Sequence, residues 1–358
     1  MFRIISTVSI LTLMTACGGE QPFDFGTTDG DQTTDQTTNT DDTTGTTDDE
    51  ASQDTGTLDT GTGLPPGTAE PSADGDILRY EAPDGNGGLV RSVAYNAEND
   101  TFAVDNLGFD GANVYTRDNQ VGSLNSYAVY EASAVSTDSL TGDPIGQITP
   151  YRAILGLSNN TNDGQTRTAF AIVRTGGYVD YGFGGFLYSR DGSVTLPTTG
   201  QARFSGDYAG IRVFNGIGGM EYTRGDMTID IDFRDFNTND AVKGLVFNRE
   251  AFNSAGDAIP LNGEGELVLP NIPFVVQQGS PSLSPNGELR GSLVNSIYDT
   301  ETGTIVEYES GTYYGIIAGD MTDPDDGGEL VGVFVVESED PRYEGITAQE
   351  TGGFILYR

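Results

Sequence analysis

Apolar and polar residues alternate along the C-terminal half of the chain, and this alternation limits what the chain can fold into. In the segment 226–233, "DMTIDIDF", every second residue from Met227 to Phe233 is apolar, and the residues between them, from Thr228 to Asp232, are polar. A period of two places alternate side chains on opposite faces of a β-sheet. Apolar residues at helical spacing are not sustained anywhere after residue 77, so the sequence predicts an all-β fold.

Eight segments of this kind, separated by Gly, Asn and Asp turn signals, follow one another near the C-terminus. They are 201–214, 226–233, 241–249, 265–276, 287–298, 305–317, 329–337 and 352–358. Short, evenly spaced antiparallel strands are typical of an up-and-down barrel or a sandwich, and an eight-stranded barrel is filled by its own side chains. We therefore expect an eight-stranded antiparallel β-barrel over 198–358.

Two further observations refine this expectation. Glycines inside the segments, such as Gly210 and Gly291, fit places where a side chain would crowd the neighbouring strand. A membrane pore would need apolar side chains on its outer face. The outward positions of 226–233 carry Asp230 and Asp232 instead, which favours a barrel with a packed interior and a solvated surface.

The part before the barrel is also β-like but less regular. Its clearest strands fall within 126–133, 151–158 and 168–190. We expect a smaller, irregular, handle-like β subdomain over 77–197, which ends at the segment "VTLPTTG".

The N-terminus has the layout of a secretory signal peptide, predicted over 1–16. One cation, Arg3, precedes an apolar run that is too short to span a bilayer. The following "LMTAC" resembles the lipobox of bacterial lipoproteins, which implies acylation of Cys17. An ordinary signal peptide is the alternative, but Cys17 is the only cysteine and has no partner for a disulfide. Known sorting rules, applied to Gly18, imply the outer membrane of a Gram-negative cell.

An acidic segment rich in Thr and Asp follows and contains no Lys or Arg between Gly18 and Asp76. Such a composition buries too little apolar surface to offset the entropy of ordering, so we expect a disordered linker over 17–76. The linker would hold the folded part away from the membrane.

Charge and composition exclude several classes of function. The chain has a formal net charge of -37, with 54 Asp and Glu against 17 Lys and Arg. This charge argues against nucleic acids and anionic membrane surfaces as partners. The chain also contains no His, which rules out catalytic triads and metal sites built on His. We therefore expect no enzymatic activity, no cofactor and no metal.

One acidic stretch, Asp320–Glu329, leaves two interpretations open. Asp320, Asp323, Asp325, Asp326 and Glu329 lie close together in sequence, and carboxylates are favoured ligands of Ca²⁺. Pro and Gly in the same stretch are turn formers, and the spacing does not match an EF-hand. We interpret the stretch as an exposed turn, with a weak cation site as the alternative.

Three other motifs are better explained by structure than by chemistry. Asp230 and Asp232 resemble a pair of hydrolytic carboxylates, but on one polar strand face they are better explained as solvated. The glycines at 216, 218 and 219 precede no helix that could hold a phosphate. The aromatic cluster Tyr178–Tyr188 is interpreted as core, with a contact patch for a partner as the alternative.

The barrel segments resemble the β-barrel domain of transferrin-binding protein B and related surface lipoproteins. The motif consists of Gly311, Tyr313, Tyr314, Gly315, Ala318, Gly327, Gly328 and Phe334. Ile316 stands where the family has Pro, and this chain has one barrel where that protein has two lobes. The resemblance implies a strand pair and its turn, but no ligand and no contact residue.

Anchor, linker and barrel together predict an outer-membrane lipoprotein that binds an unidentified protein or nutrient. A structural, envelope-shielding lipoprotein without a dedicated ligand is the alternative, in which the acidic surface acts through repulsion and hydration.

Overall fold

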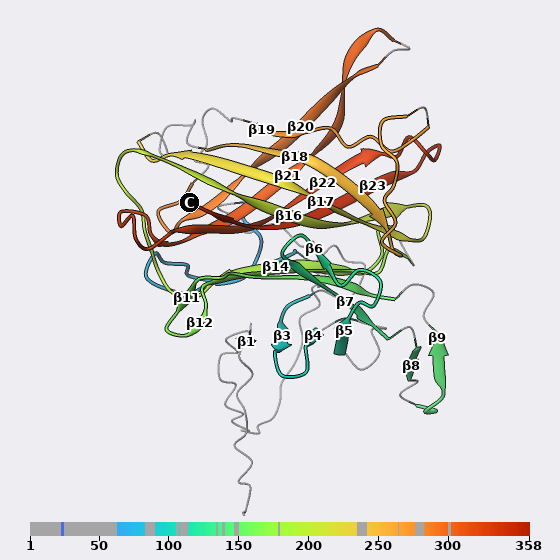
Figure 1. Ribbon diagram of the computed structural model, residues 1–358, viewed down its shortest axis with the longest axis horizontal. Coiled ribbons are helices and arrows are strands. Elements are labelled where there is room, and N and C mark those ends of the chain that lie inside the picture. The colour runs from blue at the N-terminus through green and yellow to red at the C-terminus, as the bar shows by residue number, and fades with distance from the viewer. Residues whose placement is uncertain are drawn as a thin grey trace, which may run out of the picture.

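Strands make up all the regular secondary structure in the described part of the computed structural model (Figure 1). The structure describes residues 23–24, 63–82, 90–104, 107, 114–133, 135–137, 140–146, 150–177, 180–234, 242–263, 265–275, 283–299 and 302–358. Within these ranges no helix is long and apolar enough to cross a membrane. The predicted signal peptide, Cys17 and most of the predicted linker lie outside the described residues.

The C-terminal strands close into the predicted barrel. Its strands are β16 (Gln201–Asn215), β17 (Met220–Asp232), β18 (Val242–Asn253), β19 (Ile272–Val275), β20 (Glu288–Asp299), β21 (Thr304–Asp320), β22 (Glu329–Glu339) and β23 (Thr347–Tyr357). Each strand pairs antiparallel with the next, and β23 pairs with β16, so no edge is left open. The eight-stranded antiparallel barrel expected from the sequence is confirmed.

One barrel strand is shorter than expected. The sequence predicts a strand over 265–276, but only β19, Ile272–Val275, pairs with its neighbours. Pro270 lacks the N–H that a central strand must donate, and its carbonyl oxygen accepts a hydrogen bond from Arg249 at 2.8 Å. The residues before it pack separately, where Leu267 and Leu269 cover Ala251.

The alternation in β17 is confirmed. Met227, Ile229 and Ile231 are fully buried inside the barrel, whereas Asp230 and Asp232 lie on the outer face. At Gly210 a Cβ atom would lie 2.9 Å from the carbonyl oxygen of Thr351 on the adjacent strand, so the close approach predicted for this glycine is present.

A second antiparallel sheet, curled beside the barrel, forms the less regular part. Its order is β1-β3-β4-β5-β7-β10-β13-β14-β2, with β6 paired to β7. The strands are β1 (Phe23–Asp24), β2 (Ile77–Tyr80), β3 (Val93–Asn96), β4 (Thr101–Val104), β5 (Val114–Arg117), β6 (Ser123–Leu124), β7 (Tyr127–Ala132), β10 (Arg152–Leu157), β13 (Thr168–Arg174) and β14 (Gly184–Arg190).

Three short β elements lie outside these two sheets or at their edges. The hairpins β8 (Val135–Thr137) with β9 (Pro144–Gly146) and β11 (Thr161–Asn162) with β12 (Gln165–Thr166) extend from the curled sheet. Strand β15 (Val194–Thr195) pairs in parallel with β21 and leads the chain into the barrel.

The curled sheet packs its inner face on the outside of the barrel. Phe170 and Ile172 of β13 meet Ile211 of β16 and Val331 of β22 in one apolar cluster. Because side chains alternate along each strand, β16, β22 and β23 bury both of their faces, one in the barrel and one against the sheet. The two parts therefore share a continuous core.

The chain before β2 is tied to this core. The guanidinium of Arg190 is buried and donates to the carbonyl oxygens of Ser72 and Gly75, each at 2.8 Å, and to those of Asn286 and Ile317 on the barrel side. Burial lowers the pKa of Arg190 to about 10. The last part of the predicted linker, 63–76, therefore packs on the folded part, because its backbone carbonyls satisfy a buried arginine.

Candidate functional site

The acidic stretch Asp320–Glu329 forms the turn between β21 and β22. Asp320 accepts hydrogen bonds from the backbone N–H and hydroxyl of Thr322, at 2.8 and 2.6 Å. Asp323 accepts one from the N–H of Asp325 at 2.9 Å. Asp326 pairs with Arg167, which directly precedes β13 of the curled sheet, at 2.6 Å. These carboxylates hold the turn and its contact with the neighbouring sheet.

Glu329 points away from this turn. Its carboxylate is fully buried and accepts hydrogen bonds from Ser158 at 2.6 Å, Thr168 at 2.7 Å and Asn160 at 2.5 Å. It thus joins the barrel to the curled sheet. Among the residues that the structure describes, no cluster of three or more His, Cys, Asp or Glu could hold a metal ion.

The other motifs have structural partners. Asp230 pairs with Arg203 through contacts of 2.6 and 2.9 Å on the barrel surface, and Asp232 accepts a hydrogen bond from Gln201. The glycines at 216, 218 and 219 form the β16–β17 turn. Within Tyr178–Tyr188, Phe186 and Tyr188 are core residues, while Tyr178 lies outside the described residues.

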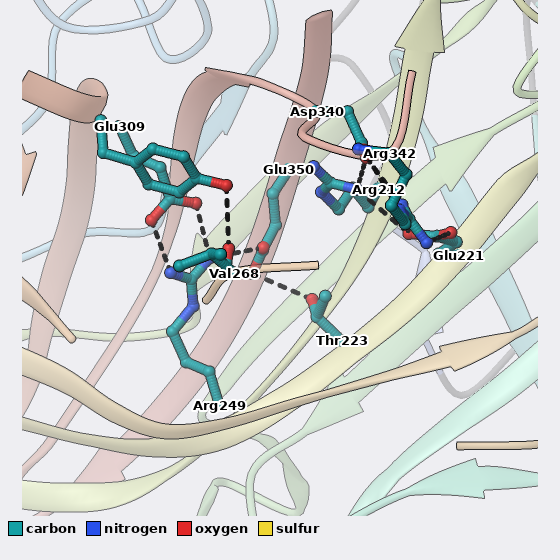
Figure 2. Close-up of polar contacts among 10 residues, drawn as sticks. Arg212, Glu221, Thr223, Arg249, Val268, Glu309, Asp340, Arg342 and Glu350 are labelled. Atoms are coloured by element: carbon teal, nitrogen blue, oxygen red, sulfur yellow. Dashed lines mark hydrogen bonds and ion pairs between the residues drawn. The ribbon is translucent and has the colours of Figure 1, made fainter. Parts of the chain in front are cut away.

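The barrel interior contains a charged region that the sequence analysis did not predict (Figure 2). Arg249 of β18 is completely buried and donates to Glu309 of β21 at 2.6 and 3.0 Å and to Glu350 of β23 at 2.7 Å. Thr223 donates to Glu350 at 2.9 Å, and Asn295 of β20 donates to Glu309. This first cluster therefore links five strands across the barrel.

A second arginine cluster lies in the same part of the barrel (Figure 2). Asp340, directly after β22, accepts hydrogen bonds from Arg212 of β16 and Arg342, each at 2.6 Å. Glu221 of β17 accepts from the same two arginines. Although burial alone would raise the pKa of Asp340, the hydrogen bonds from Arg342 and the charge of Arg212 hold it well below its usual range.

A third cluster lies between the barrel and the curled sheet. Arg152, at the start of β10, pairs with Asp118 and with Glu131 of β7. It also donates to the hydroxyl of Tyr222 on β17 at 3.1 Å. Burial raises the pKa of Glu131.

Each cluster lies at the base of a chain connection at one end of the molecule. We call these connections together the projecting end: 133–151 between β7 and β10, 296–307 at the tip of β20 and β21, and 339–346 between β22 and β23. Arg152 and Glu131 flank the first, Glu309 and Asn295 lie just below the second, and Asp340 and Arg342 belong to the third. Figure 1 shows all three connections at the right-hand side, with the β20–β21 ribbon reaching furthest from the barrel.

The projecting end carries exposed apolar side chains. Leu140 is 94% exposed, Ile305 76% and Tyr298 64%, and Val135, Ile145 and Tyr343 are also exposed. Val114, the one other large apolar side chain exposed in the described part of the chain, begins β5 beside the start of the first connection. Tyr298, Ile305 and Tyr343 lie on adjacent barrel connections, whereas the β8–β9 hairpin lies apart from them (Figure 1). Exposed apolar side chains on adjacent connections typically mark an interaction site.

The arginine clusters give this site a fixed shape. Arg342 stacks on the ring of Tyr343 at 5.4 Å, and Phe214 meets the same ring edge-on at 6.3 Å. The ribbon that carries Tyr298 and Ile305 is anchored through Glu309 and Arg249. A surface whose elements are already ordered loses less entropy when it binds a partner.

No protein-family model and no curated protein matches the sequence. Solved structures of transferrin-binding protein B are similar to it. A double mutant from Haemophilus parasuis Hp5 has a TM-score of 0.33 and 10% identity, over 79% of this chain and 51% of that chain. A single mutant from the same organism has 0.31 and 11%, over 78% and 51%. An intact Ap-TbpB, with N and C lobes, has 0.29 and 11%, over 79% and 52%.

These solved structures are of transferrin-binding protein B, whose β-barrel domain is also the one that the sequence resembles. This chain spans about half the length of those structures. At these identities and TM-scores the likeness identifies no ligand, and only the residues of this chain can indicate one.

Proposed function

We propose that this chain is a non-enzymatic binding module, anchored in the outer membrane through Cys17, that captures a protein or nutrient ligand with its projecting end. The observation that carries the proposal is that the exposed large apolar side chains of the described residues lie on or beside the three connections at this end of the molecule, with Tyr298, Ile305 and Tyr343 on the two adjacent barrel connections. Buried arginine clusters at the base of those connections support it, because they order the surface before any ligand arrives.

Tyr298→Ser with Ile305→Ser is expected to weaken capture at least about thirtyfold without unfolding the barrel. The two side chains are directly opposed across the ribbon and are mostly exposed, so their loss should change the free energy of unfolding by about 0.5 kcal/mol or less. Truncating a central aromatic anchor typically weakens binding by at least about 2 kcal/mol, or roughly thirtyfold. The measurement is retention of proteins and small molecules from culture medium by intact cells, compared with unfolding in urea.

A matched variant at the opposite end of the barrel serves as the control. Arg203→Ser with Lys243→Ser also removes two exposed side chains of similar size. Equal retention by the wild type and both variants would contradict the proposal. Altered surface charge with unchanged uptake in a strain that lacks the chain would favour the envelope-shielding alternative.

The anchor makes a separate prediction. Cys17→Ser is expected to remove incorporated palmitate and to move the chain from the membrane fraction to the soluble fraction, because several acyl chains are needed for stable attachment. Metabolic labelling and cell fractionation measure both effects. A membrane-bound, unlabelled wild-type chain would disprove acylation of Cys17.

A further inference from the structure

The projecting end of the molecule is acidic. Its three connections contain eight acids and a single arginine, Arg342. That arginine is already paired with Asp340 and Glu221. The exposed acids of the described residues there are Asp143, Glu307, Glu339 and Glu344.

The exposed bases of the barrel lie at its other end. Arg203 begins β16, Arg234 follows β17, Lys243 begins β18 and Arg358 follows β23. Strand pairing places these four positions next to one another. They lie at the end of the barrel opposite to the β20–β21 and β22–β23 connections. The acidic β21–β22 turn and Asp230 lie at that end too, so both ends of the barrel carry acids, and the projecting end is distinguished by the exposed apolar side chains that lie among its acids.

Apolar and acidic side chains are interleaved on the β20–β21 ribbon. Tyr298 lies opposite Ile305, and the next exposed residue along β21 is Glu307, opposite Ser296. Apolar anchors surrounded by charges of one sign are complementary to a surface with an apolar recess and a rim of the opposite sign.

We infer that the partner of the projecting end is a protein surface in which Lys or Arg side chains surround exposed apolar ones. This inference depends on the proposed binding function and adds the chemistry of the partner. A second copy of the chain would bring like charges together, which costs free energy. Nucleic acid and anionic lipid are disfavoured by the same repulsion.

The inference is tested with the full mature chain and three short peptide probes: alternating Arg and Leu, alternating Glu and Leu, and alternating Arg and Ser. We expect the Arg-Leu peptide to bind at least about tenfold more tightly than either other peptide, because both charge and apolar contact are required. Raising the salt from about 0.1 M to about 1 M shortens the Debye length from about 10 Å to about 3 Å and should weaken that binding about tenfold. Anionic vesicles should not bind.

Two variants assign the binding to the projecting end. Glu307→Gln, Glu339→Gln and Glu344→Gln combined should weaken Arg-Leu binding about tenfold and remove most of its salt dependence. Asp74→Asn, Asp163→Asn and Asp180→Asn combined, which remove three acids elsewhere, should leave it unchanged. Tyr298→Ser with Ile305→Ser should lower the affinity for the Arg-Leu peptide to that measured for the Arg-Ser peptide.

Several results would overturn the inference: equal binding of the Arg-Leu and Glu-Leu peptides, equal binding of the Arg-Leu and Arg-Ser peptides, no binding of any peptide, or equal effects of the two triple variants. Failure of the proposed function is distinguishable from these. If intact cells retain a ligand through Tyr298 and Ile305 but its binding does not respond to salt or to the glutamates, the function stands and the basic partner is wrong.

Discussion

Arg249→Leu is expected to lower the free energy of unfolding by about 3–5 kcal/mol. The guanidinium is completely buried and is shared by two carboxylates, Glu309 and Glu350, which are themselves buried. Without it, two negative charges remain inside the barrel, and the hydrogen bonds from Asn295 and Thr223 do not neutralise them. Urea unfolding of the purified chain measures the loss.

Two comparisons separate this effect from a general loss of a side chain. Arg203→Leu removes an arginine that also pairs with a carboxylate, but its side chain is 70% exposed, so a much smaller loss than for Arg249→Leu is expected. Combining Arg249→Leu with Glu309→Leu and Glu350→Leu should recover much of the stability, since no buried charge is then left unpaired. Similar losses for Arg249→Leu and Arg203→Leu would disprove the assigned role.

The barrel could be predicted from the sequence because its strands carry their own signal. Where one face is buried and the other solvated, as from Met227 to Asp232, the period of two appears directly in the residue types. The turns between strands contain Gly, Asn and Asp, so the count of eight followed. The length of β19 could not be predicted, because Leu267 and Leu269 are as apolar as strand residues but pack in a separate cluster.

The arginine clusters were missed for a related reason. Arg249, Glu309 and Glu350 occupy inward positions, and Glu350 is in phase with the inward residues Phe354 and Leu356 of its strand. Charged residues are usually assigned to the solvated face, so their residue types alone do not indicate an inward position. The even spacing between Glu350 and the inward residue Phe354 on the same strand was the one feature of the sequence that indicated an inward position.

The projecting end could not be predicted for a different reason. Its first connection is separated from the other two by more than a hundred residues in sequence, and all three are brought to one end only by the pairing of β7 with β10, β20 with β21 and β22 with β23. The sequence alone does not tell whether an apolar residue such as Leu140 or Ile305 is buried or exposed. Only the folded chain shows that both lie on connections at the same end of the molecule.

Asp340→Asn is expected to destabilise the chain by about 3–5 kcal/mol near neutral pH, with a dependence on pH that identifies the carboxylate. Its side chain is buried and accepts hydrogen bonds from Arg212 and Arg342. The pKa of Asp340 is lower in the folded chain than in the unfolded chain. Its contribution to stability is therefore fully present above the unfolded pKa, about 3.9, and decreases as the pH falls toward the folded pKa.

The difference between wild type and Asp340→Asn should consequently be constant between about pH 5 and pH 8 and should shrink as the pH falls below about 4. Urea unfolding across this range measures it. Asp230→Asn is the matched control, because the pKa of Asp230 is also lowered by an arginine, Arg203, yet the pair is exposed and its removal should cost about 1 kcal/mol or less. A difference that stayed constant down to pH 3 would mean that the asparagine acts by altering packing. A difference that shrinks would show that the charge of Asp340 holds the turn that presents Tyr343.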